Sequence, residues 1–147
     1  MKLAWTFVIL LSLTGTALAH EGLHEIGEPG EATAAKRTVK VTMSDNMRFQ
    51  PSTVVVKRGE TVRFVVKNVG ETKHEFMLGT IEALKEHAKL MQKFPEMEHE
   101  EPNAVTVAPG KTGELVWKFS KAGKVDFACL VPGHYEAGMR GQIAVSP

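Results

Sequence analysis

Residues 129–139, CLVPGHYEAGM, contain three side chains that can bind a metal ion. Cys129 is the only cysteine of the chain, and His134 and Met139 follow it at intervals of five residues. Thiolate, imidazole and thioether donors suit copper or zinc, whereas calcium and magnesium prefer oxygen. Structural zinc sites favour two or more cysteines and rarely include methionine. The donor set therefore favours copper.

A cysteine and two histidines in a plane, with a distant axial methionine, form the ligand set of a blue-copper electron-transfer site. The second histidine is best supplied by His74, because it opens the strand-like segment HEFMLG directly after a turn and so lies at a sheet end. The other histidines lie on segments with no predicted place beside Cys129: His20 and His24 near the N-terminus, His87 on a predicted helix and His99 in an acidic loop.

The loop over residues 129–140 joins two predicted strands and must bring its donors back to one point. A proline and a glycine at 132–133 turn the chain before His134, and Gly138 lets the backbone bend before Met139. A loop held at both ends by strands keeps its donors in one arrangement in both oxidation states of copper. Little rearrangement on gaining or losing an electron means a low barrier to transfer.

The elements that position this loop are mostly strands. Residues 37–43, RTVKVTM, alternate apolar and polar side chains, as a half-buried strand does. Two valine-rich segments, 53–57 and 61–68, are separated by a turn with glycine at its centre. Further strands are predicted over residues 74–79, 104–107, 113–120, 124–129 and 140–145.

One segment, residues 80–94, has the apolar spacing of a helix. Thr80 can cap its start and Pro95 stops it. Short strands with turns between them and one inserted helix predict an all-β, antiparallel Greek-key sandwich. Its core would hold the valines and the larger aromatic residues Phe64, Trp117, Phe119 and Phe127. An immunoglobulin-like interaction module has the same pattern, so the fold class alone does not define a function.

The N-terminal residues 1–19, MKLAWTFVILLSLTGTALA, have a basic start, an apolar run and small residues at the end. This pattern predicts a secretory signal peptide cleaved after Ala19, with an apolar run too short for a membrane span. Residues 20–36 are expected to form a flexible lead-in, and residues 37–147 a single domain. The exported chain would be soluble, with no membrane span.

The net charge and the cysteine count reduce the number of functions that the chain could have. Without Lys2 the basic and acidic residues balance, which gives no support to nucleic-acid binding. A lone cysteine in an exported protein is a metal ligand, a reactive thiol, a buried apolar residue or an intermolecular bridge. For an isolated cysteine burial is the simplest interpretation. The joint spacing of Cys129, His134 and Met139 favours the metal ligand.

The motif DFACLVPGHYEAGM, with HEF upstream after VRFVVKN, resembles the cupredoxins, a family that includes plastocyanin, azurin, auracyanin and rusticyanin. The resemblance covers residues 37–147 and is strongest to periplasmic cupredoxins associated with bacterial copper tolerance. It implies one type 1 copper ion, with His74, Cys129 and His134 as strong ligands and Met139 as the weak axial ligand. Copper would cycle between its two oxidation states in the periplasm.

One position departs from the family pattern. Many cupredoxins carry asparagine after the first histidine ligand, where its side chain ties the ligand loops together, and here the residue is Glu75. A carboxylate changes the hydrogen bonds around the ligand and the local field.

Two functions fit the proposed site: one-electron transfer to a partner such as a c-type cytochrome or a copper-handling protein, and copper sequestration or tolerance. A metal-free interaction sandwich is a third hypothesis. The electron would leave through His134, and Val131, Pro132 and Tyr135 would form a small docking rim. Four protein ligands leave no open position for substrate, so we expect a protein that is not an enzyme. We also expect it to be a monomer.

A second copper site is a weaker hypothesis. Its donors would come from Met91, Met97 and His99, together with His20 and His24. The favoured interpretation is that the two methionines pack the helix against the sandwich, and that His99 is solvated in an acidic loop.

Overall fold

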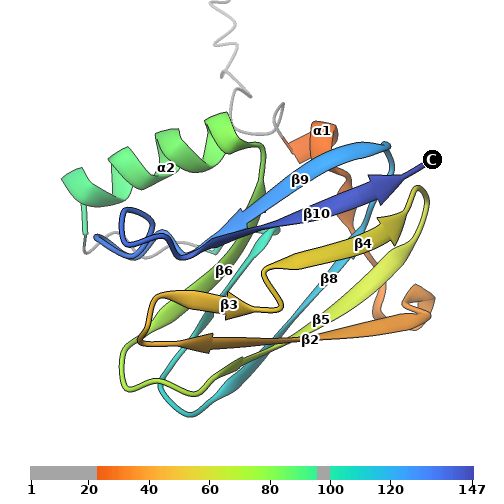
Figure 1. The fold of residues 1–147 in the computed structure, drawn as a ribbon. Helices are drawn as coiled ribbons and strands as arrows, with labels where there is room; N and C mark the ends of the chain where they lie inside the picture. Colours follow the sequence, from red (N-terminus) through yellow and green to blue (C-terminus); the bar gives the residue numbers. More distant parts are fainter. Residues whose placement is uncertain (1–22, 96–99) are drawn as a thin grey trace, which may run out of the picture.

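The computed structural model describes residues 23–95 and 100–147, which form two facing sheets with a helix over one end (Figure 1). One sheet has the strand order β1-β8-β5-β2-β3 and the other has the order β4-β10-β9-β6-β7. The strands are β1 (Glu28–Pro29), β2 (Arg37–Ser44), β3 (Arg48–Gln50), β4 (Thr53–Lys57), β5 (Thr61–Asn68), β6 (His74–Gly79), β7 (Ala104–Val107), β8 (Thr112–Lys118), β9 (Gly123–Ala128) and β10 (Arg140–Ser146). The predicted all-β sandwich with an inserted helix is confirmed.

The expectation that the strands are all antiparallel is wrong at two pairings. β2 runs parallel to β5, with Met43 opposite Asn68, and β10 runs parallel to β4. Alternation of side chains in a half-buried strand has the same period of two in either direction, so the sequence pattern does not distinguish them. The parallel pairing matters for the site, because the C-terminal ends of β2 and β5 lie at the same edge of the sheet.

The core lies between the two sheets and is rich in aromatic rings. Phe64, Phe76, Trp117, Phe119 and Phe127 are all 0% exposed. Phe76 contacts Phe64 and Phe127 with ring centroids 5.3 and 5.1 Å apart, respectively. The predicted core residues are therefore buried as expected, and the valines of β4 and β5 alternate between buried and outward positions as half-buried strands require.

The eight predicted strands are all present, with bounds within one or two residues of the observed ones. β1 and β3 were not predicted, because segments of two and three residues are too short to show an alternating pattern.

Helix α2 (Ile81–Lys93) follows β6 and packs against β6 and β9. The hydroxyl of Thr80 accepts a hydrogen bond from the Ala83 amide at 3.2 Å, which caps the helix as predicted. Leu84 and Ala88 face the sheet and are buried. The helix ends at Lys93, two residues before Pro95. The described residues also contain the short 3-10 helix η1 (Ala32–Ala34). No helix within residues 23–95 and 100–147 has the length and apolar character needed to cross a bilayer.

Part of the predicted lead-in packs on the sandwich. The helical turn α1 (Leu23–Ile26) leads into β1, which pairs with the end of β8. Ile26 is 2% exposed, and its carbonyl accepts a hydrogen bond from the Trp117 indole at 3.0 Å. These contacts could not be predicted from the low hydrophobicity of the segment, because they involve one buried side chain and backbone groups. The predicted signal peptide, residues 1–19, lies outside the described residues.

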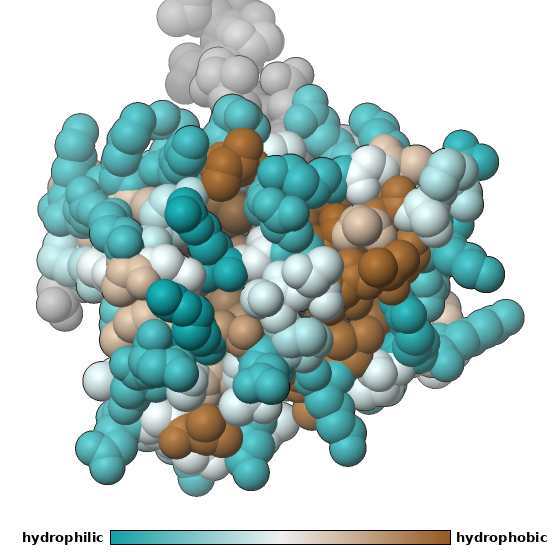
Figure 2. All heavy atoms as spheres, in the orientation of Figure 1, coloured by the Kyte–Doolittle hydropathy of each residue, from teal (hydrophilic) through white to brown (hydrophobic). Residues whose placement is uncertain are grey.

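The loop after β9, the β2–β3 turn and the β5–β6 turn gather at one end of the sandwich, on the left of Figure 1. The C-terminus and the β8–β9 turn lie at the opposite end. Figure 2 shows a mostly hydrophilic face with a hydrophobic patch on its right-hand side. Val55, on β4, is 60% exposed.

Candidate metal centre

Three of the four predicted ligands converge at the end of the sandwich where these loops gather. The Nδ1 atoms of His74 and His134 are 3.2 Å apart, and the Cys129 Sγ atom lies 3.9 Å from the first and 3.3 Å from the second. The two imidazole rings are tilted by 54° with centroids 4.9 Å apart. Two histidines separated by 60 residues therefore present the same ring nitrogen to one thiol.

The secondary structure accounts for this convergence. His74 is the first residue of β6, and Cys129 directly follows β9, which is the antiparallel neighbour of β6. The loop from Cys129 to Met139 is closed by the hydrogen bond from the Cys129 amide to the Met139 carbonyl, at 3.1 Å. Inside it the Met139 amide donates to the His134 carbonyl at 3.0 Å. Gly133 and Gly138 have φ values of 88° and 95°, as the sequence predicts for residues that reverse the chain.

The donor spacing fits a single ion. Donors about 2.0–2.3 Å from a shared ion at trigonal angles of about 120° stand roughly 3.5–3.7 Å apart. The observed separations of 3.2, 3.3 and 3.9 Å bracket this range. Two imidazoles and one thiol match the trigonal plane of a type 1 copper site, and Met139, which is 0% exposed, belongs to the same buried cluster as Cys129. The residues present therefore suit copper.

The thiol of Cys129 is buried, and backbone amides contact its sulfur in addition to the two histidines. Its Sγ accepts a hydrogen bond from the Glu75 amide at 3.3 Å. Burial raises the pKa of Cys129 to about 11, and the Glu75 carboxylate adds a small upward contribution, while the amides of Glu75 and Val131 oppose it. The thiol is thus protonated in the metal-free protein near neutral pH, so binding of copper as a thiolate complex displaces a proton.

The two histidines differ in exposure. His74 is 0% exposed, whereas His134 is half-buried in the loop. Burial lowers the pKa of His134, and repulsion from a charge on His74 lowers it further, while Asp45 has the opposite effect. Both trends keep the His134 ring neutral, which is the form that binds a metal.

The outer nitrogen of His74 meets a carboxylate. His74 Nε2 lies 3.0 Å from Asp45 Oδ1, in the turn after β2. The pKa of Asp45 is held well below its usual range, first by the Glu71 amide, then by the Thr72 hydroxyl, and also by His74 itself. Asp45 is therefore a carboxylate at neutral pH.

The β5–β6 turn is held by the side chain of Asn68. The buried Asn68 amide donates to the carbonyls of Thr72 and Val107, at 2.8 and 2.9 Å, and its oxygen accepts from the Gly70 amide. Many cupredoxins place asparagine immediately after the first histidine, and this chain has Glu75 there. Asn68 ties the turn before His74 to β7.

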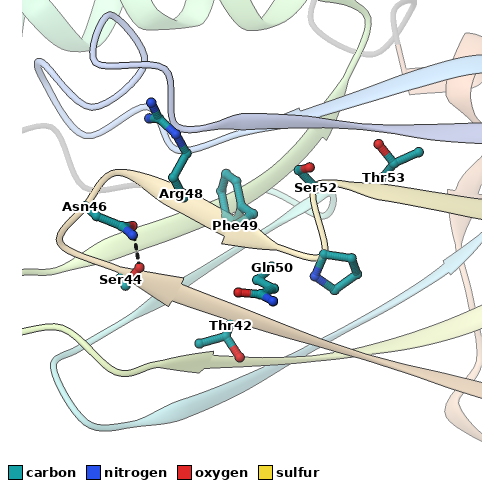
Figure 3. A pocket seen from close by; sticks show the side chains of 9 residues that line it. Thr42, Ser44, Asn46, Arg48, Phe49, Gln50, Ser52 and Thr53 are labelled. Atoms are coloured by element: carbon teal, nitrogen blue, oxygen red, sulfur yellow. Dashed lines mark hydrogen bonds between the residues drawn. The ribbon is translucent and has the colours of Figure 1, made fainter.

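Arg48 connects the β2–β3 hairpin to the loop of residues 129–139 (the ligand loop). Its guanidinium donates to the carbonyls of Met47 and Ala137, at 2.7 and 2.9 Å. Figure 3 shows the Arg48 side chain directed toward the loop before β10. The same figure shows a surface pocket on the hairpin, lined by polar residues such as Thr42, Ser44 and Gln50. This pocket is separate from the cluster of His74, Cys129 and His134.

Two contacts fasten the other side of the ligand loop. The amide of Gln92, on α2, donates to the Glu136 carboxylate at 2.6 Å. The guanidinium of Arg140 lies over the Tyr135 ring, 5.5 Å from its centroid.

The residues of the predicted second copper site are only partly described. Met91 is half-buried on α2, which fits its predicted packing role. Met97, His99 and His20 lie outside the described residues, as does the side chain of His24. The hypothesis of a second site stays a prediction.

Sequence reasoning missed Asp45, Asn68, Thr72 and Arg48. Asp45 lies in SDN, which is typical of a turn, and Asn68 ends a predicted strand. Asp and Asn are common in turns, so their presence here does not by itself indicate a metal centre. The contacts arise from strand register, which brings Asp45 to His74 across 29 residues.

The fold and the cluster together define a cupredoxin. The family of copper binding proteins described as the plastocyanin/azurin family matches residues 35–146, and the chain belongs to it. The predicted family and fold are confirmed, and the chain is a copper-binding protein with one type 1 copper site.

Relatives with curated descriptions point to one group within the family. The copper-resistant cuproprotein CopI of Rubrivivax gelatinosus is 56% identical over 129 residues, which span 88% of this chain and 78% of that protein. The protein of the same description from Pseudomonas aeruginosa is 37% identical and spans 97% of this chain and 95% of its own length.

Solved structures agree on the fold. Auracyanin B superposes with a TM-score of 0.69 at 21% identity, covering 83% of this chain and 96% of that chain. Auracyanin A from Chloroflexus aurantiacus, described as a blue copper protein, has a TM-score of 0.63 at 22% identity and covers 74% of this chain and 98% of its own. At these identities the likeness supports the fold alone.

Burial of the Cys129 thiol predicts its reactivity in the metal-free protein. We expect alkylation by iodoacetamide to be slow at about pH 8.5, the usual cysteine pKa, and to accelerate only as the pH approaches about 11, because the thiolate is the nucleophile. The unfolded protein should react at the ordinary rate at about pH 8.5. By linkage, the folded state loses stability as the pH rises between these two values. Mass spectrometry of timed samples measures the rates, and equal rates for folded and unfolded protein at about pH 8.5 would contradict the prediction.

Proposed function

We propose that this protein is an exported, periplasmic cupredoxin that transfers single electrons through a copper ion bound by His74, Cys129, His134 and Met139. The observation that supports it most strongly is the cluster of His74, Cys129 and His134, whose donor atoms lie within 4.8 Å of one another. Bound copper supplies a one-electron couple between copper(I) and copper(II). The protein keeps the donors in one arrangement and buries His74, Cys129 and Met139 away from water.

The chain is built to hold its donors still. His74 is fixed by β6 and by its contact with Asp45, and Cys129 by β9 and the Glu75 amide. The ligand loop is fastened by Arg48 on one side and by the bond from Gln92 to Glu136 on the other. A site that changes little between oxidation states has a small reorganisation cost. This rigidity supports electron transfer.

The donor nearest solvent is His134, so we place the route of the electron there. Val131 and Tyr135, next to it in the loop, are half-buried, and Pro132 is exposed. A small, partly apolar rim suits the weak encounters of redox proteins. The partner would be a c-type cytochrome or a copper-handling protein that binds this monomer at the rim.

A second candidate function is copper tolerance through sequestration. The relatives described as copper-resistant cuproproteins favour it, because they match this chain at 56% and 37% identity over most of its length. Both functions use the same ligands, and neither requires an open coordination position for substrate. We therefore do not assign an enzymatic activity.

The ligand assignment predicts the visible spectrum of the copper-loaded protein. The wild type should show an intense thiolate-to-copper band with one copper ion per chain. His74→Gln should lose the band, because an amide cannot replace the imidazole donor, while His87→Gln, on α2, should keep it. Cys129→Ser should also remove the band. Loss in His87→Gln together with persistence in His74→Gln would refute the assignment.

Electron transfer predicts a fast reaction with a redox partner. In stopped-flow mixing, the reduced protein should reduce a c-type cytochrome in a second-order reaction. Val131→Asp, at the rim, should slow this reaction because it places a charge in the docking surface. Val55→Asp, on β4 at a 60% exposed position, should leave the rate within experimental error. An unchanged visible band in both variants shows that the centre is intact, and equal rates would argue against the rim.

Copper tolerance predicts a growth phenotype. We expect a deletion strain to be more sensitive to copper than the wild type while its respiration stays normal. The wild-type gene should restore growth in copper, whereas the Cys129→Ser gene should not. Normal growth of the deletion strain in copper, together with impaired respiration, would favour electron transfer alone.

A further inference from the structure

The Asp45 carboxylate accepts hydrogen bonds from several donors close to His74. Its Oδ2 accepts from the Glu71 amide at 2.6 Å, and its Oδ1 accepts from the Thr72 hydroxyl at 2.8 Å. The same Oδ1 lies 3.4 Å from the Thr72 amide and 3.0 Å from His74 Nε2. A carboxylate only accepts hydrogen bonds, so Nε2 carries the hydrogen in this contact.

This contact sets the tautomer of the buried imidazole. With the hydrogen on Nε2, the neutral His74 ring has its lone pair on Nδ1, the atom that faces Cys129 and His134. The Thr72 hydroxyl lies 3.3 Å from His74 Nε2, but it donates its hydrogen to Asp45. It therefore does not donate to Nε2, which is free to carry a hydrogen of its own. The metal-binding form of His74 is thus prepared before any metal arrives.

The place of Asp45 is defined by the fold. The parallel pairing of β2 with β5 puts Met43 opposite Asn68, so the turn after β2 meets the turn after β5. Gly70 lies against Asp45 so closely that a Cβ there would collide with the carboxylate. Asn68 in turn holds the Gly70 amide at 2.9 Å. These contacts hold the carboxylate beside His74, although the Asp45 side chain is 37% exposed.

We propose that Asp45 is a positioning residue of the copper centre, which holds His74 with Nδ1 toward the metal and lowers the reduction potential through its negative charge. The proposal rests on the proposed ligand role of His74. A carboxylate bonded to a ligating imidazole makes the ring a stronger donor. Negative charge beside a buried ligand favours the more positive copper(II) over copper(I).

The test compares two variants that each remove one negative charge from the same end of the molecule. Asp45→Asn keeps the size of the side chain but replaces one oxygen by a donor, so the contacts with Glu71 and His74 cannot all be kept. Glu71→Gln changes an exposed side chain of the same turn and leaves the Glu71 amide in place. Asp45→Glu retains the charge and serves as the conservative variant.

We expect Asp45→Asn to raise the reduction potential and to weaken copper(II) binding about 10- to 100-fold, the usual effect of losing such a partner. Copper(I) binding should weaken less. Glu71→Gln should have a much smaller effect on both quantities, and Asp45→Glu should restore part of the potential. Equal effects of Asp45→Asn and Glu71→Gln on potential and affinity would overturn the proposal.

Nitrogen NMR of the metal-free wild type tests the tautomer without copper and without a variant that must fold. We expect His74 to carry its hydrogen on Nε2, and a hydrogen on Nδ1 would overturn the proposal. The visible spectrum of the wild type separates this outcome from the proposed function. Absence of the thiolate-to-copper band refutes the copper ligands, whereas a normal band with an unaffected Asp45→Asn refutes the role of Asp45 alone.

Discussion

The burial of one sulfur atom at the end of the aromatic core is the constraint on which the rest of this structure depends. Cys129 is 0% exposed and belongs to the same cluster as Phe76 and Phe127. The register of β6 against β9 brings the Glu75 amide to this sulfur and His74 to its side. Because packed cores resist small displacements, the donors inherit the rigidity of the sandwich.

Residue types and short spacings made much of the site predictable. Cys129, His134 and Met139 lie on one loop, and His74 opens a strand, so local sequence was enough to select them. The helix was predictable from Thr80 and Pro95 for the same reason. Strand direction was not, since alternation is the same in parallel and antiparallel strands.

The unpredicted part of the site consists of contacts between distant segments. Asp45 reaches His74 only because β2 and β5 run parallel, and Arg48 reaches Ala137 only because the β2–β3 hairpin lies beside the ligand loop. Neither residue differs in type from those of an ordinary turn or strand edge. The short strands β1 and β3 were missed because their pairing is set by the surrounding chain.

The two histidines of the copper site differ in their exposure to solvent, which affects how the bound ion could be reached from outside. His74 and Cys129 are fully buried on strand ends, while His134 is half-buried on a loop. Of these three donors His134 is the one most open to solvent, so a chelator in solution would meet it before the other two. Exchange of the ion would therefore be limited by access through the loop of residues 129–139.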